Sequence, residues 1–382
     1  MIKNIITKII ILLLSLFFLV TSNAYVAAID TDSNIDSSFQ SYINELNNYV
    51  QQNNININMD EIASNLKEGK GLEYDSILDY ILTFFFKQIR ITLSSAIIVL
   101  ILIIISSLIK SLQISEKSDV MKLTNIVCFV SLCIVLSSTF LNMLELFKNT
   151  TNTLGNIMQI VSPFMLSLLI INGAITSIGI IQPLILFASS FITFLITNII
   201  LPLVVFSVIF GIIGNLNSNE GIIKLAKYFR KISLWILGIF LTIFLGILAM
   251  ESSITKDVDS LAIKTTTSAV SNFIPVVGKF FSDSFETVVG ASKIITKVSG
   301  IVGIIVVIII VGVPVIKLIS SFVIYTLVSI LSEVLSADLK LVKIIEEFAD
   351  VYKTLCGILI ANSLMFIISV GIILNLSSSV VK

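Results

Sequence analysis

One segment of the sequence, residues 272–299, carries charged side chains at a spacing suited to binding or transport. At ~100° per residue its five charged positions fall on one helical face about 80° wide. A face of this kind can dock on a partner, line a polar opening, or lie at the membrane surface with its charges in water. All three uses stay open, although the mixed signs argue against an ion-selective ring of one charge. The five residues are Lys279, Asp283, Glu286, Lys293 and Lys297.

The segment that follows, residues 300–331, is almost wholly apolar and contains Pro314 and one charge, Lys317. About 20 apolar residues are enough to cross a bilayer, so we expect a crossing that is interrupted at the proline. A lysine inside a crossing costs ~2.5 to 3.5 kcal/mol at the membrane centre and often marks a functional path. Because the crossing could end near Ser320, the favoured interpretation is that Lys317 extends its amine to the membrane surface.

The prolines suggest an internal repeat. Pro163 and Pro202 have the same separation as Pro275 and Pro314. This predicts a parallel duplication in which each unit is a crossing, an outer helical element and a long crossing broken by proline, as in transporter folds. Two equal separations among five prolines can also arise by chance. The candidate pore or partner-contact residues are Pro202, Pro275, Lys279, Asp283, Glu286, Pro314 and Lys317.

Catalytic and cofactor-binding patterns are not found in the sequence. The 382 residues include no histidine, which removes the commonest general base and metal ligand in proteins. The three cysteines lie in apolar runs, where a thiol usually behaves as a small hydrophobic group. We therefore predict a protein that is not an enzyme and that binds no cofactor or metal. No acidic residue stands clearly inside a crossing, which argues against coupling to a proton or sodium gradient.

The composition is typical of a membrane protein. Hydrophobic residues make up 56% of the sequence and charged residues only 13%, and the apolar positions are gathered into runs of about 20 residues. Several runs lack the polar face that a water-soluble helix needs. The 24 basic residues balance the 24 acidic ones, so nothing favours nucleic-acid binding. We predict an all-α, polytopic membrane protein with about 5–7 transmembrane helices.

The first 88 residues are expected to form a signal peptide and an outer segment. Residues 1–28 have lysines ahead of a short apolar core, which predicts cleavage after Ala28; an uncleaved first membrane helix is the alternative. Residues 29–88 are predicted to form extracytoplasmic amphipathic helices whose apolar faces rest on the membrane domain or on a partner. The apolar positions of the first such helix are Phe39, Tyr42, Ile43, Leu46, Tyr49 and Val50.

Residues 89–376 form the predicted membrane domain, and the distribution of Lys and Arg indicates its orientation. The loop from Lys224 to Lys231 is the strongest cytoplasmic signal, whereas residues 149–219 contain no charge. The crossing 123–147 is expected to end outside, so only an odd number of crossings fits between that end and the cytoplasmic loop. We therefore predict a re-entrant or broken pair of half-helices at 157–181. The expected crossings are 91–112, 123–147, 183–213 interrupted at Pro202, 233–250, 300–331 and 354–376. The other segments are an outer amphipathic segment at 251–299, a cytoplasmic amphipathic helix at 332–353 and a tail at 377–382.

Several short stretches, in their order and spacing, are similar to a known family. They are Asn172 to Ser177, Leu201 to Leu203, Leu241 to Gly246, Asn272 to Gly278 with Phe281 to Asp283, and Pro314 to Lys317. Together they resemble the stage III sporulation protein AE family of endospore-forming bacteria. The resemblance extends from about Ile157 to the C-terminus, and includes the plan of signal peptide, polar outer segment and multispan domain.

The resemblance implies a protein of the mother-cell membrane that surrounds the forespore, with its N-terminal segment in the intermembrane space. It implies membrane, ring-forming and ATPase partners from the same stage III operon, and a forespore-side channel partner. The expected function is that of a non-enzymatic component of a secretion-like channel needed for forespore development after engulfment. A stand-alone secondary transporter for a small solute is the alternative, and a homo-oligomer is left open.

Overall fold

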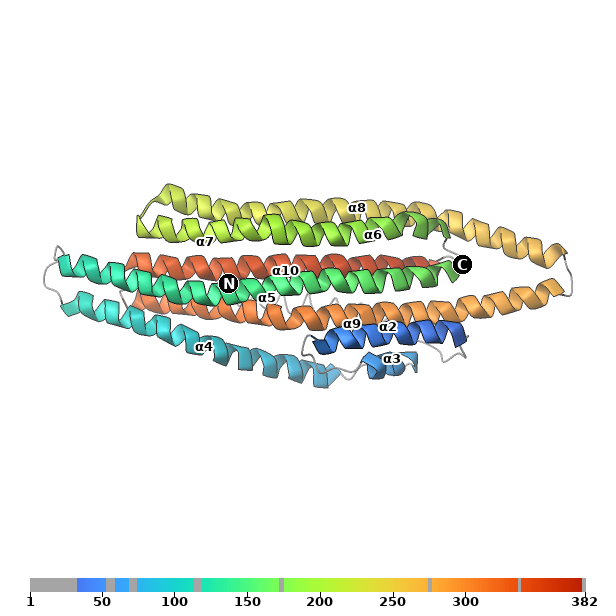
Figure 1. Ribbon diagram of the computed structural model, residues 1–382, viewed down its shortest axis with the longest axis horizontal. Coiled ribbons are helices and arrows are strands. Elements are labelled where there is room, and N and C mark those ends of the chain that lie inside the picture. Colours follow the sequence, from blue (N-terminus) through green and yellow to red (C-terminus); the bar gives the residue numbers. More distant parts are fainter. Residues whose placement is uncertain are drawn as a thin grey trace.

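In the computed structural model the chain is a bundle of long helices that lie roughly along one axis (Figure 1). The structure describes residues 33–52, 59–68, 74–112, 119–171, 175–273, 277–335 and 338–379. Every element in these ranges is helical, which confirms the predicted all-α class. The expected signal peptide, residues 1–28, lies outside them.

The elements follow one another as a series of antiparallel helices. They are α2 (Ser33–Gln52), α3 (Met59–Lys67), α4 (Tyr74–Leu112), α5 (Asp119–Ile171), α6 (Ile175–Leu195), η1 (Ile196–Ile200), α7 (Leu201–Leu216), α8 (Glu220–Phe273), α9 (Val277–Val334) and α10 (Leu339–Ser379). The α7–α8 turn lies at the same end of the bundle as the C-terminal end of α9 and the start of α10 (Figure 1). We call this the lysine-rich end, because α8 begins there with Lys224, Lys227 and Lys231.

Within the described ranges, six helical segments are long and apolar enough to cross a membrane, in agreement with the expected number. They are Phe85–Ile109, Ile126–Ile171, Ile181–Asn217, Glu220–Leu248, Ser292–Val334 and Leu339–Leu376. Several helices are much longer than a bilayer requires: α8 has 54 residues and α9 has 58. At ~1.5 Å per residue they measure about 80 Å or more, against ~30 Å of hydrocarbon. The bundle therefore extends beyond the membrane.

The expected half-helices at 157–181 are not formed. Residues 157–171 are the last part of α5, which runs without a break through Pro163, and residues 175–181 are the first part of α6. A proline inside a helix is tolerated when neighbouring helices surround it, and Pro163 is only partly exposed. The odd number of crossings required by the charges is therefore met by one return helix, α6–η1–α7.

That return helix changes its hydrogen bonding just before Pro202. Residues Ile196–Ile200 are π-helical, and the Leu201 N–H donates to the Ile196 carbonyl, five residues back. Proline has no N–H, so the preceding turn must rearrange, and a π-turn is one way to do so. The predicted crossing at 183–213 is confirmed, with a local change of helix type at the expected interruption.

Two other predicted boundaries are absent. The outer segment at 251–299 is not separate, because residues 251–273 continue α8 and residues 277–299 begin α9. Residues 339–379 form one helix, α10, which joins the expected cytoplasmic helix to the last crossing. The helix order matches the suggested repeat, since α5 with α6–η1–α7 and α8 with α9 are two successive hairpins. The repeat itself stays a prediction.

Helix α9 is the core of the bundle and packs on α10, α5 and α4. A Cβ atom at Gly300 would lie 2.6 Å from the Leu374 side chain of α10. Only glycine allows the two helices to approach so closely there.

Replacing Gly300 by Val is therefore expected to destabilise the bundle by about 1–3 kcal/mol through overpacking. Thermal unfolding of the protein in nanodiscs would measure the loss, and the second change Leu374→Ala should recover part of it. Gly371→Val is the matched control, because nothing lies within 4 Å of a Cβ atom at that position of α10. Equal effects of Gly300→Val and Gly371→Val would contradict the packing argument.

The outer helix α2 docks on the bundle as expected. Its residues Phe39, Tyr42, Ile43 and Leu46 are buried. The Tyr42 ring stacks on Phe164 of α5 at a centroid distance of 4.3 Å, and its hydroxyl donates to the Ser299 carbonyl of α9 at 3.0 Å. Tyr42 thus fastens the N-terminal segment to two helices of the membrane domain.

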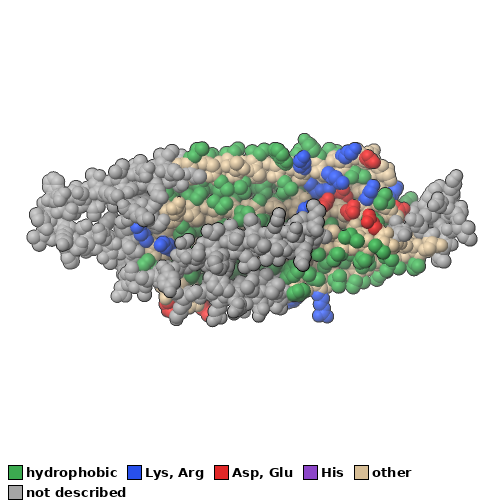
Figure 2. Space-filling view, turned by 180° about the vertical axis from the view of Figure 1, so that it is seen from behind, with side chains coloured by type: hydrophobic (Ala, Val, Ile, Leu, Met, Phe, Trp, Pro, Cys, Tyr) green, Lys and Arg blue, Asp and Glu red, His purple; other side chains and the backbone are tan. Residues whose placement is uncertain are grey.

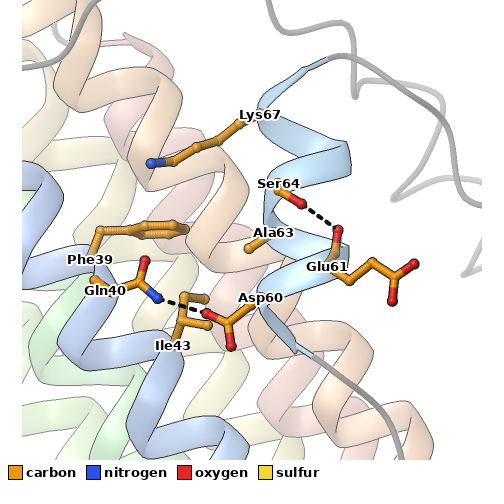
Figure 3. Close-up of a pocket in the computed structure, with 8 residues that line it drawn as sticks. All are labelled: Phe39, Gln40, Ile43, Asp60, Glu61, Ala63, Ser64 and Lys67. Carbon is orange, nitrogen blue, oxygen red and sulfur yellow. Dashed lines mark hydrogen bonds between the residues drawn. The ribbon is translucent and has the colours of Figure 1, made fainter.

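A surface hollow of about 540 Å³ lies between α2 and α3 (Figure 3). Its polar groups bond to one another: Gln40 Nε2 donates to Asp60 Oδ1 at 2.7 Å, and Lys67 pairs with Asp36 at 2.8 Å. The Lys67 amine also lies 4.3 Å from the centre of the Phe39 ring. These contacts make the hollow a joint between the two outer helices.

Candidate functional site: a charged strip at the lysine-rich end

Charged side chains gather on one face of the bundle at the lysine-rich end. Figure 2 shows Lys and Arg side chains next to Asp and Glu side chains there, bordered by hydrophobic ones. The residues come from the start of α8, the end of α9 and the first half of α10, and all are exposed. We call the following set the charged strip: Lys227 and Lys231 of α8, Glu333 of α9, and Glu346, Asp350 and Lys353 of α10.

A buried ion pair lies beneath the strip. Arg230 Nη1 of α8 donates to Glu347 Oε2 of α10 at 2.5 Å, and to Ser207 Oγ of α7 at 3.4 Å. Only 7% of the Arg230 side chain and 9% of the Glu347 side chain are exposed. The second guanidinium nitrogen, Nη2, lies 3.8 Å from Asp350 Oδ2 at the surface. One guanidinium therefore connects three helices and links the core to the strip.

The helix beside this pair leaves room for it. Gly211 of α7 faces Glu347, and a Cβ atom at Gly211 would lie 3.4 Å from Glu347 Oε2. One turn further on, Asn215 Nδ2 donates to the Gly211 carbonyl at 2.8 Å. A buried ion pair has a large desolvation cost, which is offset only when the geometry is good and further hydrogen bonds are made. The Ser207 and Asp350 contacts supply those further interactions.

Glu346 and Lys353 of the strip also interact with neighbouring side chains. Glu346 lies within electrostatic reach of Lys227, Glu333 and Asp350. The Lys353 amine lies 5.9 Å from the centre of the Phe322 ring of α9. Glu346 therefore has two acidic neighbours, on α9 and α10, and one basic neighbour, on α8.

An exposed apolar surface on α4 reaches the same end of the bundle as the strip. On α4, large apolar side chains are exposed from Phe86 to Leu108, a length of about 33 Å, which is close to one hydrocarbon thickness. The Ser107 hydroxyl donates to the Leu335 carbonyl, so this apolar surface lies beside roughly the last 20 residues of α9.

The contacts of α10 with α9 give the position of the strip along the bundle, measured from the end of α9. Tyr352 stacks on Tyr325 at 5.6 Å, which places Lys353 about 15 Å, Asp350 about 10 Å and Glu346 about 5 Å from the end of α9. At this level α8 also exposes Trp235, which is 62% accessible and lies one helical turn after Lys231. Charged and apolar side chains are therefore neighbours on the exposed side of α8.

The residues predicted from the sequence lie elsewhere. Pro202 is half-buried at the start of α7, and Pro314 is buried inside α9, which continues through it without a break. Pro275 lies outside the described residues, and Lys279, Asp283 and Glu286 lie on α9 at positions whose side chains the structure does not describe. Lys317 is half-buried.

Helix α9 continues past Ser320 to Val334, in line with the expected segment 300–331. By the alignment with α4, Lys317 lies near one edge of the apolar surface, a few residues from the level of Phe86. That its amine extends to the membrane surface stays a prediction.

Sequence reasoning missed Arg230 and Glu347, although helical spacing contained a signal for both. Glu347 falls on the same face as Ile344 and Val351, which are buried. Arg230 likewise falls on the face of Ala226 and Leu237. Opposite charges on the apolar faces of two helices indicate a buried pair. Glu347 is buried between helices, in the part of α10 that was predicted as the cytoplasmic amphipathic helix 332–353.

Comparison with known proteins identifies relatives. A family model described as stage III sporulation protein AE matches residues 57–377. The chain is 28% identical over 260 residues to the Stage III sporulation protein AE of Bacillus subtilis (strain 168), and the alignment covers 68% of this chain. The chain spans 65% of the length of that relative. No solved structure matches.

Proposed function

The chain belongs to the stage III sporulation protein AE family, and we propose that it is a non-enzymatic membrane component of the channel that links mother cell and forespore. The observation that carries the proposal is the family match over residues 57–377, which includes all six candidate spans. In this role the protein supports forespore development after engulfment. It acts as a scaffold and conduit wall, and its energy source is a separate ATPase.

The length of the bundle supports a role between two membranes. Helices α8 and α9 continue well beyond the apolar spans that end at Leu248 and begin at Ser292. This hairpin, together with α2 and α3, would extend into the intermembrane space. We propose that the charged face with Lys279, Asp283 and Glu286 contacts ring-forming or forespore-side partners there, and that Pro202 and Lys317 lie along the channel side of the bundle.

The lysine-rich end is proposed to lie in the mother-cell cytoplasm. Lys and Arg are enriched in loops on the cytoplasmic side of membranes, and the α7–α8 turn is followed by four of them. The ATPase partner would meet the protein on this side, because ATP is available only there.

A deletion strain tests the proposal. We expect spores to arrest after engulfment, and the wild-type chain expressed in the mother cell to restore spore yield. Pull-down of the tagged full-length protein from sporulating cells is expected to recover the ring and ATPase proteins of the operon. An unaffected spore yield in the deletion strain would refute the proposal.

The alternative function is a stand-alone secondary transporter, which the two successive hairpins favour. The buried Glu347 is an ionisable group in a span, but its carboxylate is bound by Arg230 at 2.5 Å and is therefore held as an ion pair. Solute uptake by the purified protein in liposomes, lost on replacement of Glu347 by Gln, would support this alternative over the channel component.

Cysteine labelling is expected to place the lysine-rich end inside and α2 outside. With the three native cysteines replaced, Cys at Ser218 and at Val334 should react only with a membrane-permeant maleimide, and Cys at Glu45 also with an impermeant one. All three positions are exposed, whereas Ser332 is fully buried and would not report. Labelling of Ser218 and Glu45 from the same side would contradict this topology.

A further inference from the structure

We propose that a path for water runs inside this chain along one face of α10, and that the ion pair of Arg230 with Glu347 closes it at the lysine-rich end. The path is marked by four side chains of α10 that are both polar and buried. We call Glu347, Thr354, Asn362 and Ser369 the buried polar stripe, and none of these residues is more than 7% exposed. Because the path lies within one chain, it does not depend on the channel function.

The stripe follows a single face of α10 over a length close to that of a membrane crossing. Successive members are seven, eight and seven residues apart, so at ~100° per residue they fall within a face about 80° wide. From Glu347 to Ser369 the stripe is about 33 Å long at ~1.5 Å per residue. All four residues belong to the candidate span Leu339–Leu376. A polar face of this length can hold water through the thickness of the bundle.

Three neighbouring helices enclose this face of α10. Glu347 binds Arg230 of α8, and Gly211 of α7 leaves room beside its carboxylate. The next residue, Phe348, packs edge-on against Phe140 of α5 at a centroid distance of 6.0 Å. The stripe therefore lies where α10 meets α5, α7 and α8, away from the surface of the bundle.

Helix α5 presents a polar group near the level of Asn362. Helices α5 and α10 run in the same direction (Figure 1), and the Tyr352 hydroxyl donates to Thr139 Oγ1 at 3.3 Å. Counted from that bond, Asn362 and Thr151 lie ten and twelve residues further along, within about 3 Å of the same level. Thr151 is fully buried, and its hydroxyl donates to the Phe147 carbonyl at 3.0 Å. Its oxygen can therefore still accept a hydrogen bond.

Asn362 is the side chain that calls for a ligand. It is fully buried, and within the described part of the chain neither Nδ2 nor Oδ1 has a hydrogen-bond partner. A buried amide without partners is costly, and ordered water is the common way to satisfy one. The hydroxyls of Thr354 and Ser369 donate to carbonyls of their own helix, so both oxygens can accept from water. Water thus finds donors and an acceptor at Asn362 and further acceptors on either side.

Arg230 closes the stripe at the lysine-rich end. Its Nη1 donates to Glu347, while Nη2 lies 3.8 Å from Asp350, whose side chain is 52% exposed. A guanidinium that turns fully toward Asp350 leaves the Glu347 carboxylate free to bind water. Asn215 Oδ1 of α7, one turn beyond Gly211, is also buried and without a partner among the described residues. Polar acceptors therefore lie on both sides of the pair.

Silver ions, which enter water-filled spaces and bind thiols, test the path in the purified full-length protein in nanodiscs. Asn362→Cys is made with the three native cysteines replaced, and a second variant keeps Cys356 as its single cysteine. After treatment with Ag⁺, the remaining thiol is labelled in denaturant with a fluorescent maleimide. We expect the thiol of Asn362→Cys to react at least tenfold faster than Cys356. Burial alone predicts the opposite order, since Asn362 is 0% and Cys356 5% exposed.

Thr354→Val tests whether water enters from the lysine-rich end. The change keeps the shape of the side chain but removes a hydroxyl of the stripe between Glu347 and Asn362. It should slow the reaction of Asn362→Cys at least tenfold. Ser363→Ala is the matched control, because it also removes a buried hydroxyl of α10 but lies ~100° around the helix from Asn362. It should leave the rate unchanged.

Thr151→Cys reports on the same level from α5 and keeps the test decisive if Asn362→Cys does not fold. Its thiol is also expected to react at least tenfold faster than Cys356. Rates at or below that of Cys356 in both variants would show a dry seam between helices and overturn the proposal. A rate that Thr354→Val leaves unchanged would overturn it as well, because water would then reach this level by another route.

Discussion

Replacing Glu347 by Ala is expected to destabilise the bundle by about 3–5 kcal/mol, because it leaves the Arg230 guanidinium buried without its carboxylate partner. The side chains are 7% and 9% exposed and 2.5 Å apart, so water cannot readily replace the lost contact. Arg230→Ala should cost a similar amount, since it leaves the Glu347 carboxylate buried alone. Unfolding of the protein in nanodiscs, followed by circular dichroism, measures both values.

The double replacement Arg230→Met with Glu347→Leu separates charge from packing. Apolar side chains of similar volume often substitute for a buried ion pair with little loss, so the double variant should be much more stable than either single one. Asp350→Ala is the control, because Asp350 is 52% exposed and its contact to Arg230 is 3.8 Å long. It should cost less than about 1 kcal/mol. Single variants as stable as wild type would show that the pair is hydrated and not buried.

The helical spans could be predicted from the hydropathy of the sequence. A bilayer requires about 20 apolar residues per crossing, so the runs around Ile91, Leu123 and Thr354 had to be helices. Hydropathy contains no information on where a helix ends outside the membrane. The continuation of α8 and α9 beyond residues 251 and 299 therefore appeared as a separate segment.

Prolines were the main source of error in the fold. A proline removes one hydrogen bond and is expected to break a helix in water. In this bundle α5 continues through Pro163 and α9 through Pro314, because tightly packed neighbours stabilise both helices. Among the prolines of the described helices, Pro202 alone is accompanied by a change in helix type, at η1. The half-helices at 157–181 had another origin, because they were introduced to fit an odd number of crossings within 149–219.

The candidate site was missed because a charge was taken as a sign of a loop. Lys224, Lys227 and Lys231 were assigned to a cytoplasmic turn, and Glu346 to a surface helix. The structure places these charges on helices that also expose large hydrophobic residues, such as Tyr228. The packing of three helices decides whether each charge faces a neighbouring helix or the surface. The residue pattern of a single helix contains no information on that packing.

Replacing Tyr42 by Ala is expected to release α2 from the membrane domain while the six spans stay folded. The change removes a buried aromatic ring that stacks on Phe164, and such losses cost about 3–5 kcal/mol. It also leaves the Ser299 carbonyl without the tyrosine hydroxyl as donor. Hydrogen exchange of the amides in α2, compared with that of α9, measures the effect. Unchanged protection of α2 would show that Tyr42 does not hold this helix.

Tyr42→Phe and alkaline pH distinguish the ring from the hydroxyl. Phe keeps the stack and loses one hydrogen bond, so docking should weaken by only about 1 kcal/mol. Burial raises the pKa of Tyr42 above its ordinary value near 10. The released state therefore loses its proton first, so docking is constant below about pH 10 and weakens as the pH rises beyond it. Tyr42→Phe should lack this alkaline weakening, because its ring has no proton to lose; an equal loss in both proteins would assign the effect to other groups.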